Sequence, residues 1–213
     1  MKDIVIIGAG GHAKVVADII LKRKQLLGDK VNIIGFLDDN LEKIQYDTIF
    51  GIPILGGTNL VEKFKCKNYE YIIAVGNNFL RRKIVDMHSD VKYYTAIHPE
   101  SIIGNEVQIG EGTVVMANTV INSYTKVGKH CILNTSCVIE HDNFIESYVH
   151  ISPNATLCGN VSINRYSWIG AGATIIQNKK IGEKVIVGAG SVVTRDVKDN
   201  YTVIGNPERI IKS

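Results

Sequence analysis

The sequence predicts two folds in one chain of 213 residues: a small parallel α/β domain over residues 1–100, then a parallel β-helix over residues 101–196. Two observations lead to this prediction. Residues 1–100 alternate short apolar runs, glycine-rich turns and amphipathic stretches. Residues 101–196 carry an aliphatic residue at every sixth position without a break. The remaining residues, 197–213, form a C-terminal tail.

Composition excludes several classes of protein. The chain carries 24 Lys and Arg, 21 Asp and Glu and 45% apolar residues, which excludes a disordered chain. No apolar run approaches the ~20 residues of a membrane span, and the start is not a signal peptide, so we expect a cytoplasmic protein without a membrane partner. Four Cys are too sparse for a disulfide framework. Residues 179–213 carry seven basic and four acidic side chains, too few for nucleic-acid binding. They suit a small polyanion, and an ordinary solvated surface is the open alternative.

The α/β domain is predicted from apolar runs that alternate with helical patterns. An amphipathic pattern predicts one helix from about His12 to Lys24, and a second helix follows the third strand. The predicted strands are 4–7, 31–37 and 71–75, and the predicted second helix is 79–87.

A glycine-rich turn follows the first predicted strand. Gly8-x-Gly10-x-x-Ala13 fits a dinucleotide-binding fingerprint of a Rossmann-like domain, and backbone N–H groups at a helix start attract phosphate. Asp38-Asp39 and Gly76-Asn77 follow the next two strands, at the sheet edge where such domains bind ligands. Two structural alternatives remain open: a tight turn at the glycines, and aspartates that cap the turn after their strand.

The β-helix is predicted from the unbroken six-residue period. Such a period fits a short strand plus a turn, and three such sides close one triangular coil with the aliphatic side chains stacked inside. Short side chains often stand two positions earlier, and Gly often follows. The sixteen aliphatic residues are Ile103, Ile109, Val115, Ile121, Val127, Leu133, Ile139, Ile145, Ile151, Leu157, Ile163, Ile169, Ile175, Ile181, Val187 and Val193.

One histidine stands in a context typical of catalysis. His141 is preceded by Glu140 and followed by Asp142, and a carboxylate beside an imidazole orients it as a base. His150 follows half a coil later. The hexads contain no Ser-His-Asp or Cys-His pattern, and the chain has no CxxC or HExxH, so we expect neither an enzyme nucleophile nor a metal.

These motifs together resemble one bacterial family. They are similar to the PglD/NeuD-like acetyltransferases, which act on nucleotide-linked amino sugars or sialic acid. The segments that carry the resemblance are the hexads, Ile4–Val16, Asp38-Asp39, Gly76-Asn77-Asn78 and the segment from Asn134 to Asp142. The resemblance covers Lys2 to about Ile210. It implies a left-handed β-helix, acetyl-CoA as co-substrate, and a homotrimer with active sites between subunits.

The resemblance also implies roles for individual residues. His141 matches the general base, and Asp142 its carboxylate partner, where many members have Glu. His150 matches the residue at the thioester end of acetyl-CoA. The implied pantetheine-lining residues are Gly170, Ala171, Gly188 and Ala189, and the implied nucleotide-sugar residues are Gly10, Gly11, His12, Asp38, Asp39, Gly76 and Asn77. The tail departs from the family at Glu208-Arg209, where a small residue and Lys are usual.

The resulting prediction is an N-acetyltransferase for the 4-amino group of a nucleotide-linked sugar, UDP-linked by preference, that serves bacterial surface glycan synthesis. Three alternatives stay open. O-acetylation of sialic acid or another sugar would use the same base. An NAD-dependent oxidoreductase would explain the glycine turn but not the hexads. A noncatalytic hexapeptide scaffold would make the His141-Asp142 pair accidental.

Overall fold

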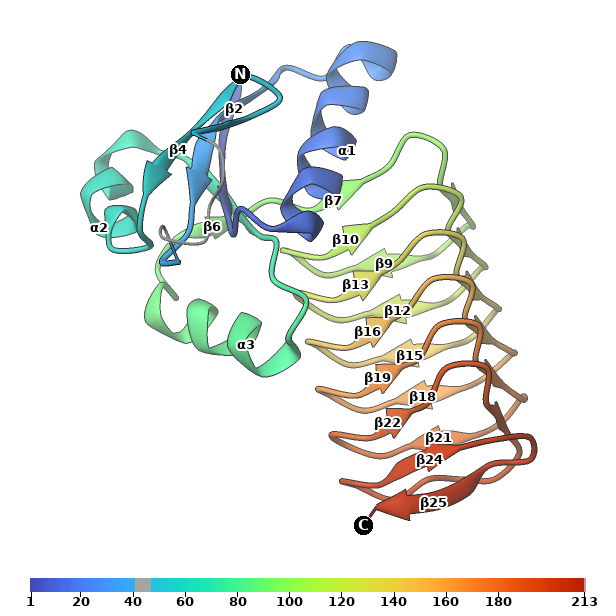
Figure 1. Ribbon diagram of the computed structural model, residues 1–213. Coiled ribbons are helices and arrows are strands. Elements are labelled where there is room, and N and C mark those ends of the chain that lie inside the picture. Colours follow the sequence, from blue (N-terminus) through green and yellow to red (C-terminus); the bar gives the residue numbers. More distant parts are fainter. Residues whose placement is uncertain (41–46, 213) are drawn as a thin grey trace. The chain divides into compact units, whose positions relative to one another are not determined.

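The computed structural model describes residues 1–40 and 47–212. The chain divides into two compact units, Met1–Pro99 (unit 1) and Glu100–Ser213 (unit 2) (Figure 1). Unit 1 is an α/β domain and unit 2 a β-helix, which confirms the predicted fold class. Within the described residues, no helix is both long and apolar enough to cross a bilayer.

Unit 1 is built on a six-stranded sheet in the order β3-β4-β2-β1-β5-β6, parallel except for β3. The strands are β1 (Lys2–Ile7), β2 (Val31–Leu37), β3 (Thr48–Ile49), β4 (Ile52–Gly56), β5 (Glu70–Ile73) and β6 (Lys92–Tyr93). The three predicted strands correspond to β1, β2 and β5. Strand order reverses at β1, between β2 and β5, which makes this the topological switch point of the sheet.

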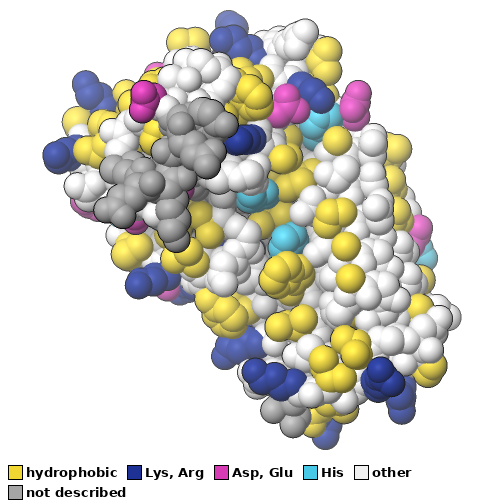
Figure 2. Space-filling model, viewed as in Figure 1, with side chains coloured by type: hydrophobic (Ala, Val, Ile, Leu, Met, Phe, Trp, Pro, Cys, Tyr) yellow, Lys and Arg dark blue, Asp and Glu magenta, His cyan; other side chains and the backbone are white. Residues whose placement is uncertain are grey.

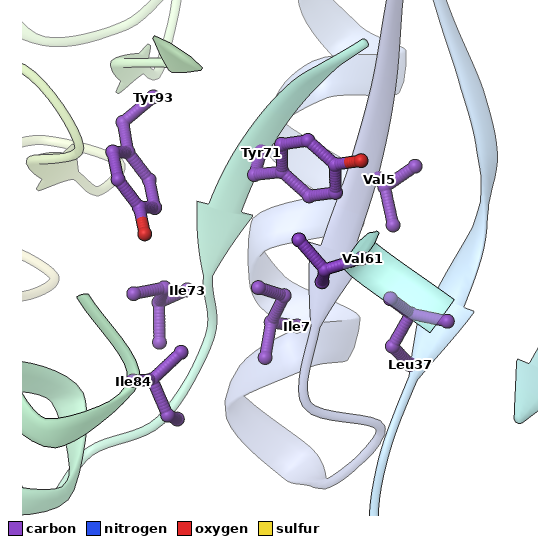
Figure 3. Close-up of a cluster of buried hydrophobic side chains, with 8 residues drawn as sticks. All are labelled: Val5, Ile7, Leu37, Val61, Tyr71, Ile73, Ile84 and Tyr93. Carbon is purple, nitrogen blue, oxygen red and sulfur yellow. The ribbon is translucent and has the colours of Figure 1, made fainter. Parts of the chain in front are cut away.

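Helices cover both faces of this sheet (Figure 1). They are α1 (Gly11–Leu27), α2 (Leu60–Phe64), a 3₁₀ turn (Lys65–Lys67) and α3 (Asn78–Met87). Because side chains alternate along a strand, Val5 and Ile7 face α2 and α3, and Ile4 and Ile6 face the other way. Figure 3 shows Val5 and Ile7 with Val61 of α2 in one buried cluster. The short strand β7 (Ala96–Ile97) follows at the end of the unit.

Unit 2 consists mainly of two-residue strands, and sixteen of them end at the sixteen predicted aliphatic residues. The strands are β8 (Ile102–Ile103), β9 (Gln108–Ile109), β10 (Val114–Val115), β11 (Val120–Ile121), β12 (Lys126–Val127), β13 (Ile132–Leu133), β14 (Val138–Ile139), β15 (Phe144–Ile145), β16 (His150–Ile151), β17 (Thr156–Leu157), β18 (Ser162–Ile163), β19 (Trp168–Ile169), β20 (Thr174–Ile175), β21 (Lys180–Ile181), β22 (Ile186–Val187) and β23 (Val192–Val193). Strands one coil apart pair in parallel, as in Ile121 with Ile139, up to the last strand of each sheet.

The strands form three sheets, which are the sides of a left-handed triangular coil. Sheet I contains β10, β13, β16, β19 and β22; sheet II contains β8, β11, β14, β17, β20 and β23; sheet III contains β9, β12, β15, β18 and β21. The chain passes from II to III to I and back to II, so each turn lies at a II/III, III/I or I/II corner.

A regular backbone feature makes each corner. Every sixth residue from Glu106 to Gly190 has a positive φ, between 54° and 71°. This left-handed conformation favours Gly, Asn and Asp, which explains Asn154, Asn160 and Asp142 at such positions.

Small residues inside the corners tie neighbouring coils together. The Thr113, Thr119 and Thr125 hydroxyls are buried, and each donates to a backbone oxygen of the next coil. These bonds satisfy corner carbonyl groups that the strand ladders leave free. The six-residue pattern therefore specifies both the apolar stack and the polar lining of the corners.

The tail continues the β-helix beyond the predicted boundary at residue 196. Strand β24 (Thr202–Ile204) extends sheet I by pairing in parallel with β22, and β25 (Arg209–Lys212) pairs with β24 in the antiparallel direction. The tail lacks the hexad period, because the chain reverses direction after β24 and β25 pairs with β24 instead of starting another coil.

Candidate active site

Three segments meet where parallel strands of unit 1 end. Residues 8–11 follow β1, Asp38-Asp39 follow β2, and Gly76-Asn77 follow β5. Since β1 lies between β2 and β5, the structure brings the predicted nucleotide-sugar residues to one place, at the switch point of the sheet.

The glycines of the first segment differ in what they require. Gly8 has φ +109°, and a Cβ there would lie 2.8 Å from the Ala74 carbonyl oxygen, so the fold itself demands glycine. Gly10 caps the start of α1, and a Cβ at Gly10 or Gly11 would meet nothing within 4 Å. The open space at Gly10 and Gly11 leaves their backbone accessible to a ligand.

The two aspartates organise these loops. Asp38 accepts hydrogen bonds from the Ala9 amide (2.8 Å) and the Asn40 amide (2.9 Å). Asp39 accepts from the Thr58 amide (2.7 Å) and hydroxyl. Asp38 therefore holds the glycine loop against the end of β2. Its bond to the Asn40 amide caps the turn after β2, which is the structural alternative that the sequence left open.

His12 and Arg81 add a polar centre to this region. The almost fully buried Arg81 guanidinium donates to the Val75 and Gly76 carbonyl oxygens, at 2.9 and 3.2 Å. Burial, together with the positive charge of Arg81, lowers the pKa of His12 to about 4. His12 is thus neutral near pH 7, and its buried Nε2 has no hydrogen-bond partner among the described residues.

Asn77 has a structural function in addition to its predicted one. Its side-chain oxygen accepts from the Leu80 amide at 2.9 Å and so caps the start of α3.

In unit 2, the predicted catalytic pair is in contact. His141 Nδ1 lies 2.8 Å from Asp142 Oδ2, at a II/III corner where both side chains are exposed. With the proton on Nδ1, the Nδ1–H group donates a hydrogen bond to Asp142, and Nε2 keeps a lone pair that can accept a proton. The geometry is that of an oriented base open to a substrate.

The coil below supports the imidazole. Gly159 stands one coil after His141 at the same corner, and a Cβ there would come within 2.7 Å of His141 Cε1. Glycine at this position therefore leaves room for the ring. The preceding side chain, Glu140, accepts a hydrogen bond from Asn122 at 2.7 Å across the neighbouring coil.

His150 belongs to another side of the prism. It lies in β16 of sheet I, stacks on Trp168 with ring centroids 5.3 Å apart, and its Nε2 is 3.2 Å from the Asn134 amide nitrogen. In a three-sided coil, sheet I lies opposite the II/III corner that carries His141. The two histidines of one chain therefore lie on opposite sides of its β-helix.

The predicted cofactor-lining residues lie at I/II corners, next to the sheet that carries His150. Gly170 and Gly188 pack so tightly on the following coil that a Cβ would clash at 2.5 and 2.6 Å, which is a structural reason for glycine. Ala171 and Ala189 are exposed at successive coils of the same corner, and the Ala171 carbonyl accepts from the Gly190 amide.

Sequence reasoning missed several residues of these sites. Trp168 could have been found, since it pairs with His150 from the next coil and so occupies the equivalent hexad position. Asn134 lies in a segment that carries the resemblance, but the sequence gives no sign of its contact with His150. Arg81 gave no signal, because a basic residue beside Arg82 and Lys83 looks like part of a solvated helix face.

Comparison with known proteins gives consistent matches. Residues 3–88 match the PglD N-terminal domain family. The chain is 38% identical over 121 residues to the UDP-N-acetylbacillosamine N-acetyltransferase of Bacillus subtilis, a match that covers 55% of this chain and 52% of that protein. The aligned part thus spans about half the length of this curated relative.

Two solved structures are similar over nearly their whole length. The acetyltransferase domain of PglB from Neisseria gonorrhoeae is 36% identical with a TM-score of 0.91, covering 99% of this chain and 100% of that one. A mutant of perosamine N-acetyltransferase from Caulobacter crescentus, solved with CoA and GDP-perosamine, is 32% identical with a TM-score of 0.90, covering 100% and 98%.

Proposed function

The chain belongs to the PglD/NeuD-like family of sugar acetyltransferases, and on that premise we propose that it transfers an acetyl group from acetyl-CoA to the amine of a nucleotide-linked amino sugar. The observation that carries the proposal is the exposed His141–Asp142 pair at a β-helix corner. Two of the relatives described above are N-acetyltransferases, which favours N-acetylation over O-acetylation.

The chemistry follows from the pair. The sugar amine, in its neutral form, attacks the thioester carbonyl, and His141 Nε2 takes the proton that the nitrogen loses. Asp142 stabilises the imidazolium through Nδ1–H. The C–S bond then breaks, and the proton held by His141 can pass to the leaving thiolate. No covalent enzyme intermediate is needed in this sequence.

The acceptor is assigned to unit 1. The accessible backbone at Gly10 and Gly11, at the start of α1, suits a phosphate, and neutral His12 follows these glycines in the first turn of the helix. We favour a UDP-linked 4-amino sugar made for a surface glycan, and a cytoplasmic reaction, because acetyl-CoA and nucleotide sugars are cytoplasmic metabolites. A GDP-linked acceptor is the closest competitor, since one relative binds GDP-perosamine.

The assembly we propose is a homotrimer with sites between subunits. His141 and His150 lie on opposite sides of one β-helix, so a single chain cannot bring both to one thioester. A neighbouring chain in a cyclic trimer can supply the second histidine.

A thiol-release assay tests the function. Purified protein is mixed with acetyl-CoA and UDP-, GDP- or dTDP-linked 4-amino sugars, with sialic acid as an alcohol acceptor. Release of CoA thiol with a nucleotide-linked amino sugar alone supports the proposal. Turnover with sialic acid but with no amino sugar would contradict it.

A further inference from the structure

The corner that carries His141 continues to the C-terminal end of the β-helix. Residues one coil apart stand at the same place in successive coils, so His141 is followed by Gly159, Gln177 and Arg195. Coils rise by about 4.8 Å each, which places the Arg195 backbone about 14 Å from that of His141 along the corner. An extended pantetheine arm spans a distance of the same order.

A buried carboxylate holds Arg195 at this position. Glu208 Oε1 accepts from Arg195 Nε at 3.0 Å, and Glu208 Oε2 accepts from the Thr194 amide (2.8 Å) and hydroxyl (2.9 Å). The Glu208 side chain is only 5% exposed, while that of Arg195 is 74% exposed. The pair therefore fixes the Nε edge of the guanidinium and leaves most of the side chain exposed to solvent.

Glu208 is ionised in this setting. Burial raises the pKa of its carboxyl, but the hydrogen bonds from Thr194 and Arg195 outweigh burial and hold the pKa below its ordinary value. The carboxylate thus remains an acceptor for Arg195 throughout the neutral pH range.

A basic cavity adjoins this pair. It has a volume of about 360 Å³ and its lining includes Arg195, Lys198 and Arg209, with Tyr201 among them. On the face shown in Figure 2, Lys and Arg side chains gather at the C-terminal end of unit 2. Asp196 and Glu208 also line it, so three basic side chains face two acidic ones and the lining keeps a net positive charge, which favours an anion.

We propose that Glu208 is a positioning residue for acetyl-CoA: it holds the Arg195 guanidinium against a phosphate of the nucleotide end, while the acetyl end lies at His141. This inference rests on the proposed function: Arg195 would bind the nucleotide end of acetyl-CoA, and Glu208 would hold Arg195 in place. It also explains Glu208-Arg209, the place where the tail departs from the family pattern, as part of an anion site with its own geometry.

The test compares acetyl-CoA with acetylpantetheine, which lacks the nucleotide and its phosphates. Arg195→Ala is expected to raise KM for acetyl-CoA by roughly tenfold or more, with kcat at saturation within about twofold, because the lost contact is a charged one remote from the reacting atoms. KM for acetylpantetheine should not change. Acetyl-3′-dephospho-CoA identifies the phosphate: an effect that persists assigns the diphosphate, and an effect that disappears assigns the 3′-phosphate.

Glu208→Gln tests whether Glu208 acts through Arg195. This variant should also raise KM for acetyl-CoA. The double variant should have the same KM as Arg195→Ala alone, because Glu208 acts through Arg195. Arg165→Ala is the matched control: its Nε donates to Glu146 at 3.1 Å in a similar exposed pair at a III/I corner, and its KM should stay at the wild-type value.

The outcomes are distinct for the two proposals. Wild-type turnover combined with an unchanged KM in Arg195→Ala, or an equal rise in KM for acetylpantetheine, would overturn the Arg195–Glu208 assignment alone. A wild-type protein that neither binds CoA in calorimetry nor releases thiol with any acceptor would overturn the proposed function and this inference together.

Discussion

Asp142 Oδ2 lies 2.8 Å from His141 Nδ1 although both side chains are more than half exposed, at 57% and 63%. Two exposed neighbours seldom hold one geometry without a constraint. Here the backbone supplies it, since Asp142 occupies a left-handed corner position with φ 60° and Gly159 leaves space for the ring from below. The His141 ring is therefore held in position by the coil and not by burial.

Replacing the base tests its function directly. His141→Ala should lower kcat by roughly 10²–10⁴, the usual contribution of general-base catalysis, with the melting temperature unchanged because the side chain is exposed. Lys184→Ala is a matched control, since Lys184 pairs with its neighbour Glu183 at another left-handed corner. A His141→Ala rate above about half of the wild-type rate would exclude His141 as the base.

Gly159 offers a test of ring placement that leaves the dyad intact. A methyl group in Gly159→Ala would press on His141 Cε1, which lies 2.7 Å from the ideal Cβ position, so the exposed ring must shift. Because a displacement of about 1 Å in a reacting group can lower a rate roughly 10²-fold, kcat should fall at least tenfold with KM for acetyl-CoA nearly constant. Wild-type kcat in a folded Gly159→Ala protein would contradict this positioning.

Gly11 separates ligand binding from folding in the glycine loop. A side chain in Gly11→Val enters open space within the protein, so the fold should persist, but it occupies the place where a phosphate would approach the backbone. Calorimetry should detect weaker nucleotide-sugar binding with unchanged CoA binding. Gly8→Ala should instead destabilise unit 1, since its Cβ would clash with the Ala74 carbonyl. Equal acceptor affinity in Gly11→Val and wild type would leave the loop with a structural function only.

The repeat explains why unit 2 is almost fully predictable. A six-residue period with stacked aliphatic residues determines strand ends, pairing partners and corners, so His141 and Asp142 could be placed from the sequence alone. The tail could not, because Thr202–Ile204 and Arg209–Lys212 lack that period, and their place follows from pairing with β22 and with each other. Arg81 was equally hidden, since its burial depends on loop carbonyl groups and not on any helical pattern.

His12 predicts a pH dependence of stability in unit 1. Its folded pKa of about 4 lies below the ordinary value of 6.5, so protons bind the unfolded state more readily. The contribution of His12 to the free energy of unfolding is fully present above pH 6.5 and is lost as pH falls toward 4. For a pKa shift of this size, the full contribution is about 3 kcal/mol.

Urea unfolding of wild type and His12→Gln measures this effect. Far-UV circular dichroism follows unit 1, which contains all the helices among the described residues. His12→Gln should lose less free energy of unfolding between pH 7 and pH 4.5 than the wild type does. Around pH 8, where His12 is neutral in the folded and the unfolded state, the difference in free energy of unfolding between the two proteins should not change with pH. Parallel pH curves for the two proteins would contradict the buried neutral imidazole.

The opposite placement of His141 and His150 leads to a test of shared sites. A trimer of His141→Ala chains lacks His141 at every site, and a trimer of His150→Asn chains lacks His150, so each is expected to be inactive alone. The first chain keeps an intact sheet I face, and the second keeps an intact II/III corner. After subunit exchange at equal concentrations, about one quarter of the interfaces in a cyclic trimer pair two intact residues, and a corresponding share of wild-type activity should return.

Sites built within one chain would give no recovery, since every chain then carries one lesion. Sedimentation must detect a trimer, and mass spectrometry must demonstrate exchange before a negative result counts. An active monomer, or proven exchange without recovery, would overturn the shared-site trimer.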